Sequence, residues 1–184
     1  MDGDDISLPT RLEREVEFLN NNPNFAFVST AMILFDDNGD WGNFKKLNEF
    51  PKKEDLINVP AFCHAPCMVR REAYLAVGGY TVDDRLLRVE DCHLWFKMYA
   101  NGYKGANLLE PLYKMRDDKE ASKRRTLKAR KNGIYVMCIG FKLVKMPWYM
   151  YFHLVKFIML EIIKGSLPKS VYDKLHRRNL NLIK

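Results

Sequence analysis

The stretch Gly78–Trp95 reads GGYTVDDRLLRVEDCHLW. Its two leading glycines permit a tight backbone reversal, because glycine adopts positive φ without a steric penalty. Glu90 and Asp91 then open an apolar helical pattern, and a helix N-terminus favours ionised carboxylates. The stretch therefore predicts an acidic loop followed by a helix that begins at two carboxylates. Such a pair suits a general base, although a capped surface helix has the same pattern.

A second acidic cluster, Asp2-Gly3-Asp4-Asp5, stands at the start of the sequence. Carboxylates two residues apart on a turn suit a hard divalent cation such as Mg²⁺ or Mn²⁺. A short loop can supply oxygen ligands and still leave coordination positions for phosphate oxygens. The cluster therefore makes Asp2 and Asp4 candidate metal ligands, although the motif alone is weak.

Four segments, taken together and in order, give the sequence a specific pattern. They read DGDDISLPTRLEREVEFLNNNP, FCHAPCMVRREAYLAVGGY, VEDCHLWFKMYANGY and EPLYKMR. In this order they resemble glycosyltransferase family 2, the inverting, sugar-nucleotide-dependent enzymes of polysaccharide and glycolipid synthesis. The resemblance covers residues 1–116. It implies an α/β fold, namely the second half of the A-type glycosyltransferase architecture: a mixed sheet with flanking helices, followed by a C-terminal helical appendage.

The resemblance implies a role for each motif. Asp91 is expected to be the catalytic base, with Glu90 orienting the acceptor or supporting Asp91. Asp2 and Asp4 are expected to hold Mg²⁺ or Mn²⁺ against the diphosphate of a nucleotide-sugar donor. The residues expected to contact the donor or a carbohydrate or lipid-linked acceptor are His64, Gly79, Asp84 and Arg116. A hydrogen-bonded loop histidine and a basic strand end are the structural alternatives for the first and last of these.

Family members begin with a hydrophobic strand, a turn and a βαβ region that holds the nucleotide base and ribose, whereas this sequence opens on the acidic motif. The resemblance therefore implies a partial catalytic domain at residues 1–118 and a basic appendage at residues 119–184. A separate N-terminal half becomes a candidate partner. The alternative is a catalytically inactive fragment that acts as a peripheral membrane or interaction protein.

Charge divides the 184 residues unevenly. Residues 119–184 carry 16 Lys and Arg against three acids, a net charge of +13, and residues 1–118 carry a net charge of −6. A pI of about 9.2 raises the possibility of a nucleic-acid partner. The excess charge lies on a tail beside an apolar helical face, and no nucleic-acid reader motif accompanies it. We therefore expect no nucleic-acid partner.

The segment Trp148–Lys164 has the clearest amphipathic pattern in the sequence. At 100° per residue, one face gathers Trp148, Tyr151, Phe152, Val155, Ile158, Met159, Ile162 and Ile163, and the other gathers His153, Lys156, Glu161 and Lys164. The segment is too short and too charged for a good transmembrane span. Basic residues beside a wide apolar face favour a helix lying on an anionic membrane surface. The predicted location is cytoplasmic, peripheral on the inner face of the cell membrane; packing on the catalytic core, or on the N-terminal half that this sequence lacks, is the alternative.

The sequence predicts three further elements and the state of the cysteines. Leu12, Val16 and Leu19 recur at helical spacing and predict one buried stripe on a surface helix. Residues 25–35 predict a strand, and residues 106–109 predict a short final strand before a proline. The cysteines are expected to be reduced thiols, because no secretion signal precedes them and their spacing with nearby histidines matches no common zinc site: Cys63, Cys67, Cys92 and Cys138.

Overall fold

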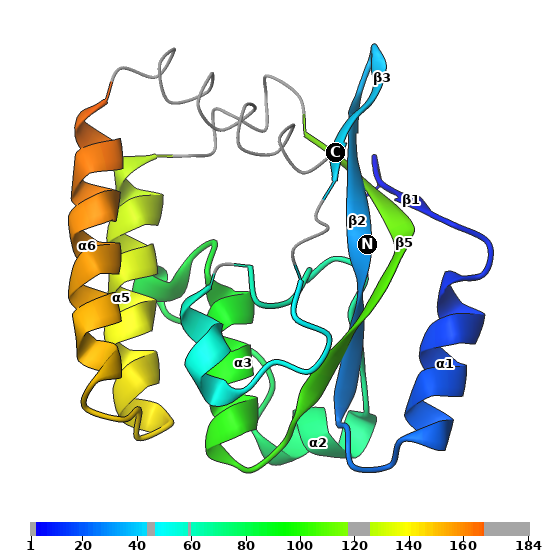
Figure 1. The fold of residues 1–184 in the computed structure, drawn as a ribbon, viewed down its shortest axis with the longest axis horizontal. Helices are drawn as coiled ribbons and strands as arrows, with labels where there is room; N and C mark the ends of the chain where they lie inside the picture. Colours follow the sequence, from blue (N-terminus) through cyan, green and yellow to red (C-terminus); the bar gives the residue numbers. More distant parts are fainter. Residues whose placement is uncertain (1–2, 44–46, 59, 118–125, 168–184) are drawn as a thin grey trace.

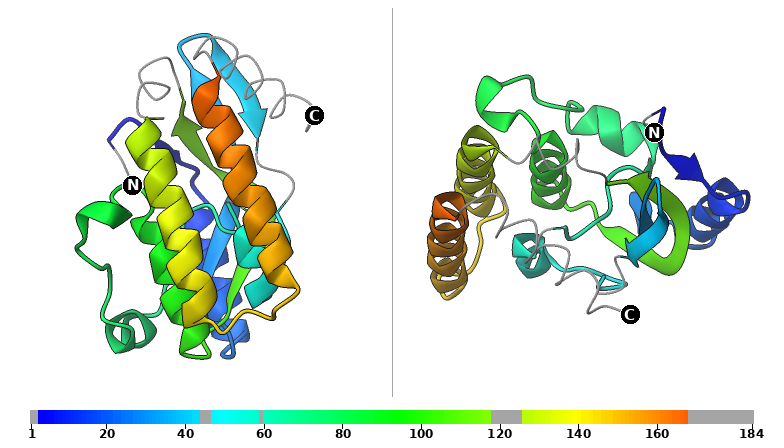
Figure 2. Two further views of the ribbon diagram at one scale, coloured as in Figure 1. Left: turned by 90° about the vertical axis from the view of Figure 1, so that its left-hand side faces the viewer. Right: turned by 90° about the horizontal axis from the view of Figure 1, so that it is seen from above.

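The computed structural model describes residues 3–43, 47–58, 60–117 and 126–167. A mixed sheet runs through the centre, with helix α1 on one face and helices α3, α5 and α6 layered on the other (Figure 1). Figure 2 shows the same layers from above, with α6 outermost. The predicted α/β class, a mixed sheet with flanking helices, is confirmed.

Over the described residues the sheet has five strands, four of them in the order β1-β5-β2-β3, with β4 also paired to β2. The strands are β1 (Ile6–Ser7), β2 (Phe27–Asp36), β3 (Gly39–Asn43), β4 (Met68–Val69) and β5 (Gly105–Arg116). Strands β2 and β5 are parallel, and the other pairings are antiparallel. The buried, β-branched content of the predicted 25–35 segment thus forms the central strand β2.

Strand β5 is longer than predicted, because it continues through Pro111 to Arg116. Its register against β2 shifts on both sides of Ala31, which stands opposite Pro111. Proline has no N–H for the ladder and is tolerated where a strand is irregular. The pairing then resumes as far as Phe35 opposite Arg116. Because β5 continues past this irregularity, Arg116 lies at the far end of the sheet.

Five α-helices and two short 3-10 helices are described. They are α1 (Arg11–Asn21), α2 (Arg71–Ala76), α3 (Glu90–Ala100), α5 (Leu127–Leu143), α6 (Met150–Ser166), η1 (Lys53–Ile57) and η2 (Asp84–Leu86). Helix α3 begins at Glu90, as predicted from the carboxylate pair.

The C-terminal helices share one hydrophobic core with the sheet and α3. The ring of Phe27 on β2 stacks on Trp95 of α3, with centroids 4.6 Å apart. A Cβ at Gly140 of α5 would lie 2.2 Å from the Phe96 ring, so glycine permits close approach of α5 to α3. Leu154 of α6 belongs to the same buried cluster. The C-terminal helices are thus packed on α3 and the sheet; the predicted domain boundary at 118 and 119 lies outside the described residues.

Helix α6 is oriented by a half-buried ion pair with α5. Arg130 on α5 contacts Glu161 on α6 at 2.8 Å, and Lys164 contacts the other oxygen of Glu161 at 2.7 Å. Glu161 and Lys164 thus lie on one face of the helix, as the amphipathic pattern predicted, and the contact with Arg130 turns Glu161 toward α5. Within the described residues, no helix is both long enough and apolar enough to cross a membrane.

The predicted buried stripe of α1 is wrong for two of its three residues. Leu12 is 55 % exposed and Val16 is 45 % exposed, whereas Arg11 and Glu15 are buried with Leu19. The buried face is displaced by one residue, or about 100° around the helix. Periodicity could not identify it, because the residues that α1 buries against the sheet form a charged pair.

We expect Glu15→Gln to change how stability depends on pH. Burial raises the pKa of Glu15 to about 7, and Arg11 opposes that shift. Between the ordinary pKa and about 7, the folded state therefore retains a proton that the unfolded chain releases, so the Glu15 contribution to stability is lost as pH rises through about 7. Glutamine keeps an oxygen for Arg11 and has no proton to lose.

Urea unfolding of both proteins measures this effect. The free energy of unfolding of wild type, relative to Glu15→Gln, should fall between about pH 5 and about pH 8. The exposed substitution Glu13→Gln is the matched control on the same helix and should leave the wild-type pH dependence intact. Parallel pH curves for wild type and Glu15→Gln would contradict the raised pKa.

Candidate functional site

Four side chains gather where α3 begins. The hydroxyl of Tyr80 lies 3.1 Å from Nε2 of His64, and the His64 ring lies 6.0 Å from the Trp95 ring. Burial raises the pKa of Tyr80 to about 12, and the negative charge of Asp91 acts in the same direction. The structure therefore brings the predicted residues His64 and Asp91 together, and it adds Tyr80 and Trp95, which sequence analysis missed.

The glycine pair places Tyr80 in this cluster. Gly78 and Gly79 both have positive φ, +73° and +57°. A Cβ on Gly79 would lie 2.9 Å from the Tyr74 side chain, and the Gly79 carbonyl accepts a hydrogen bond from Nζ of Lys97. These contacts give Gly79 a structural role in the turn. The predicted substrate contact of Gly79 stays a prediction.

The two aspartates of the acidic loop have different environments. Asp83 accepts hydrogen bonds from the backbone N–H and guanidinium of Arg85 at 2.8 and 2.7 Å. These bonds lower the pKa of Asp83 to about 2 and commit its carboxylate to the loop. Asp84 is exposed. Its predicted role in substrate binding stays a prediction, and of the two it has the carboxylate open to solvent.

Helix α5 contacts the same acidic loop. The buried side chain of Asn132 donates to the carbonyl of Leu87 at 3.0 Å. The guanidinium of Arg85 lies over the Tyr135 ring, 4.6 Å from its centroid. Arg88 has φ of +70°, a conformation that non-glycine residues adopt only where surrounding contacts enforce it. The C-terminal helices therefore help to fix the segment that leads into Glu90 and Asp91.

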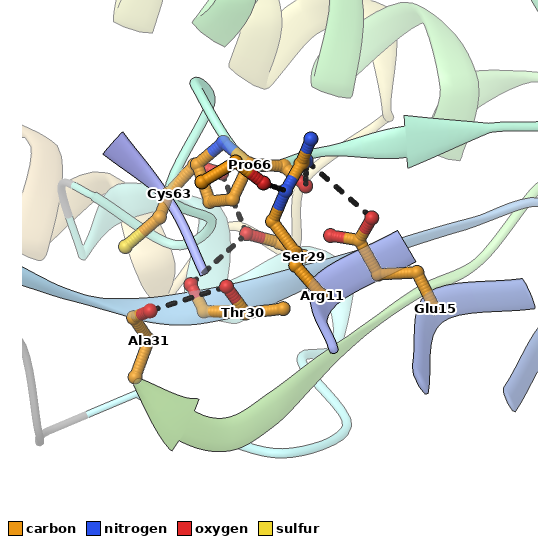
Figure 3. Close-up of polar contacts among 8 residues, drawn as sticks. Arg11, Glu15, Ser29, Thr30, Ala31, Cys63 and Pro66 are labelled. Carbon is orange, nitrogen blue, oxygen red and sulfur yellow. Dashed lines mark hydrogen bonds and ion pairs between the residues drawn. The ribbon is translucent and has the colours of Figure 1, made fainter. Parts of the chain in front are cut away.

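Buried polar side chains on α1 and β2 donate hydrogen bonds to the loop that carries His64 (Figure 3). Ser29 on β2 donates to the Cys63 carbonyl at 2.5 Å. Arg11 on α1 donates to the Pro66 carbonyl at 3.1 Å and contacts Glu15 at 3.4 Å. These hydrogen bonds hold the backbone on both sides of His64. The loop is therefore fixed in position, although the imidazole ring itself is exposed.

The acidic turn joins the end of β5. Asp5 accepts from the Tyr113 hydroxyl at 2.8 Å and from the Arg116 backbone N–H at 2.9 Å. The Arg116 guanidinium contacts Asp37 at 2.7 Å. Asp4 is exposed, and Asp2 lies outside the described residues. The structure thus brings the predicted residue Arg116 to the acidic turn.

Tyr113 connects the two parts of the site. Its hydroxyl binds Asp5, while its buried ring belongs to a cluster with Cys63, and Ala65 packs against that cluster. Cys63 and Ala65 flank His64 in the sequence. The acidic turn and the cluster near Asp91 are therefore linked through a single buried side chain and the loop it supports.

The donor set for a cation is incomplete within the described residues. They contain no group of three or more His, Cys, Asp or Glu side chains placed to hold a metal. Asp5 is occupied by Tyr113 and Arg116, which leaves the exposed carboxylate of Asp4 as the open oxygen donor of the described turn. The cysteines have free thiols, and burial raises the pKa of Cys63 to about 12.

This arrangement defines an α/β protein with a carboxylate pair at a helix start, beside an exposed histidine, a tyrosine and an acidic turn. No known family model matches the chain. It is 32 % identical over 179 residues to the candidate glycosyltransferase EpsE of Bacillus subtilis (strain 168), and 30 % identical over 121 residues to the amylovoran biosynthesis glycosyltransferase AmsE of Erwinia amylovora.

It is also 30 % identical over 190 residues to the UDP-Gal:alpha-D-GlcNAc-diphosphoundecaprenol beta-1,3-galactosyltransferase of Escherichia coli. The matches to the Bacillus and Escherichia proteins cover 97 % of this chain, and the match to AmsE covers 63 %. The chain spans 63 % and 66 % of the Bacillus and Escherichia proteins and 43 % of AmsE, which is less than two thirds of each. It is thus a relative of proteins named as glycosyltransferases.

Proposed function

We propose that the chain carries the acceptor side and catalytic base of an inverting glycosyltransferase of family 2. It would transfer a sugar from a nucleotide-sugar donor to an acceptor hydroxyl in polysaccharide or glycolipid synthesis. The observation that supports this most is the position of Asp91 at the start of α3, beside His64 and Tyr80. The similarity of nearly the whole chain to named glycosyltransferases supports the reaction class.

In this proposal the reaction is a single displacement. The acceptor oxygen attacks the anomeric carbon while Asp91 accepts the hydroxyl proton, and the bond from that carbon to the nucleoside diphosphate breaks. Attack opposite to the leaving group inverts the configuration. Glu90 would orient the acceptor or support Asp91. His64, Gly79 and Asp84 are the residues around the acceptor.

Arg116 lies at the acidic turn, and in the proposal its charge stabilises the leaving diphosphate. Asp2 and Asp4 would hold Mg²⁺ or Mn²⁺ there. The cation, when bound, neutralises charge on the leaving diphosphate. The exposed carboxylate of Asp4 is compatible with this role, and Asp5 fixes the turn through Tyr113 rather than binding the cation itself.

We expect Asp4→Asn to weaken cation-dependent donor binding with little change in stability. The position is an exposed turn, where substitutions usually change the free energy of unfolding by under about 0.5 kcal/mol. Isothermal titration of nucleoside diphosphate with and without Mg²⁺ measures the effect. Asp40→Asn, an exposed turn-side carboxylate paired with Lys114, is the control and should not alter the Mg²⁺ dependence. Diphosphate binding that is unchanged by EDTA would contradict the metal assignment.

The donor base and ribose are assigned in this proposal to a nucleotide-binding part equivalent to the portion of the relatives that this chain does not span. That part would act with the acidic turn described above. The printed name of the Escherichia relative includes a diphosphoundecaprenol acceptor, which supports a lipid-linked acceptor here. A lipid-linked acceptor also fits a peripheral position on the inner face of the cell membrane, reached through the exposed face of α6.

Product formation from a panel of sugar nucleotides tests the proposal. The chain is assayed alone and together with the unmatched portion of the Bacillus relative, with methyl glycosides and lipid-linked sugars as acceptors. Transfer that requires both parts supports the proposed division of the site. Transfer by the chain alone contradicts that division but not the reaction. The absence of transfer from every donor would favour an inactive interaction protein.

A further inference from the structure

A small cavity lies beside Asp91 on α3. Its volume is about 40 Å³, and its walls are formed by the apolar side chains of Leu56, Pro60, Ala61 and Phe62 and by residues of α3. Asp91 and Trp95 both line it. These two residues are four apart on the helix, so their side chains lie on the same face, one turn from each other. The cavity therefore has one acceptor group and one indole in its wall.

The indole of Trp95 has an unused hydrogen-bond donor. The side chain is buried, and among the described residues its Nε1–H has no hydrogen-bond partner. Buried donors in folded proteins are nearly always paired, and one that is not calls for a ligand, a water or a functional reason. Because Trp95 has this unpaired donor and lines the cavity together with Asp91, a polar ligand in the cavity is the partner that both residues suit.

Packing fixes the direction of that donor. The Trp95 ring stacks on Phe27 with an interplanar angle of 13° and centroids 4.6 Å apart. The Phe62 ring contacts it from a second side at 5.6 Å. A ring held by two aromatic neighbours has little rotational freedom. The N–H is thus positioned before any ligand arrives, as a group that must orient a reacting hydroxyl should be.

We propose that Trp95 binds the acceptor, with its indole N–H donating a hydrogen bond to the hydroxyl oxygen whose proton Asp91 accepts. The inference rests on the proposed transferase function and adds a residue to it. A hydroxyl group suits the two wall groups, because its oxygen can accept from the indole while its hydrogen is donated to the carboxylate. A second lone pair of that oxygen stays available for attack on the anomeric carbon.

The size of the cavity restricts what enters it. One water needs about 10–15 Å³ of space of this kind, so a cavity of about 40 Å³ has room for a hydroxyl group and the carbon that bears it. The rest of the acceptor sugar lies outside, toward the exposed His64 and Tyr80. The apolar walls contact carbon and hydrogen atoms next to the reacting hydroxyl. A permanently bound water that bridges Trp95 and Asp91 is the competing occupant.

Proton and nitrogen NMR of the intact chain tests the inference without requiring turnover. The chain has three tryptophans and thus three indole N–H signals, which Trp→Phe variants assign. Methyl glycosides of glucose, galactose and N-acetylglucosamine are the probes. The Trp95 signal should shift saturably with at least one of them, and Asp91→Asn should weaken that shift. The indole of Trp148, which is 77 % exposed in the turn before α6, is the internal control and should not move.

Trp95→Phe provides the kinetic arm, because phenylalanine keeps the ring that stacks on Phe27 and removes only the N–H. In the completed enzyme, the acceptor KM should rise about tenfold, the usual effect of losing one hydrogen bond, while the donor KM stays at the wild-type value. Trp148→Phe is the matched substitution and should change neither constant for a soluble acceptor.

Two results would overturn the inference. If amide signals of His64 and Tyr80 shift with a glycoside while the Trp95 indole does not, the acceptor binds without Trp95 and the proposed function survives alone. If the Trp95 signal stays fixed and Trp95→Phe transfers sugar with unchanged KM, the indole serves only a structural water. Failure of the proposed function is recognised separately, by the absence of product from wild type.

Discussion

Asp91→Asn is expected to reduce sugar transfer by about 10²- to 10⁴-fold, the usual contribution of a general base. Asparagine keeps the size of the side chain and one oxygen, but it cannot accept the proton of the acceptor hydroxyl. Asp91 lies in the first turn of α3, where the helix dipole favours a charged carboxylate. Losing that charge costs about 0.3–1 kcal/mol of stability, so the variant should still fold.

The measurement is the rate of product formation by the completed enzyme, with acceptor above its KM so that kcat is compared. Glu72→Gln is the matched control, because Glu72 is an exposed carboxylate in the first turn of α2. It should retain wild-type activity. Full activity in Asp91→Asn would remove Asp91 as the base and direct attention to Glu90 or Asp84. Loss of kcat in both variants would indicate a general effect of helix charge.

The parts of the site that could be predicted are those encoded by neighbouring residues. The glycine pair, the acidic loop and the carboxylates at the start of α3 follow one another in the sequence, and local rules for turns and helix starts place them correctly. Tyr80 directly follows the glycines, so its position could have been identified by the same rules. Its partner His64, sixteen residues away, could not be paired with it by local rules.

The parts that could not be predicted depend on tertiary contacts. Helix α1 buries Arg11 and Glu15 because the Pro66 carbonyl and the Tyr113 ring lie opposite, and hydrophobic periodicity does not register a buried charged pair. Pro111 predicted a strand end, whereas β5 continues through it with a shift in its register against β2. Asn132 reaches the acidic loop from forty-five residues away. The predicted metal ligand Asp2 lies outside the described residues.

Substitutions on the outer face of α6 are expected to have a second large effect, on binding to membranes. The inner side of this helix packs against the rest of the protein, since Met150 and Leu154 are buried in the core. The outer side keeps a row of apolar side chains in solvent, of which Phe152 is 70 % and Ile162 is 60 % exposed. Figures 1 and 2 place α6 as the outermost layer on this side of the molecule.

Charge on this face favours an anionic lipid surface. Glu161, the single acidic residue of α6, is compensated by Arg130 and Lys164. Lys142, Lys145 and Lys156 are exposed on or beside the helix pair. An exposed apolar row beside lysines that form no ion pair within the described residues is the composition of a helix that lies in a membrane interface. Each lysine near an anionic surface contributes about 1 kcal/mol.

The double substitution Phe152→Glu and Ile162→Glu is therefore expected to lower partitioning onto vesicles of phosphatidylglycerol and phosphatidylethanolamine by at least about 100-fold. Each apolar side chain withdrawn from the lipid forfeits about 1.5–3 kcal/mol, and tenfold corresponds to about 1.4 kcal/mol. Flotation of wild type and variant with such vesicles measures the effect, and wild-type binding should weaken as salt rises. Substitution suits this test better than deletion of the helix, because deletion would also remove Met150 and Leu154 from the core.

The chain supplies a matched control on the opposite side of the sheet. Leu12 and Val16 on α1 are 55 % and 45 % exposed, and replacing both by glutamate adds the same charge to another apolar surface helix. If α6 is the membrane contact, the α1 variant should bind vesicles nearly as wild type does, since α1 faces away from the lipid in that orientation. Equal losses in the two variants would show that net charge alone drives adsorption, and vesicle binding unchanged by the α6 substitutions would exclude this face as the contact.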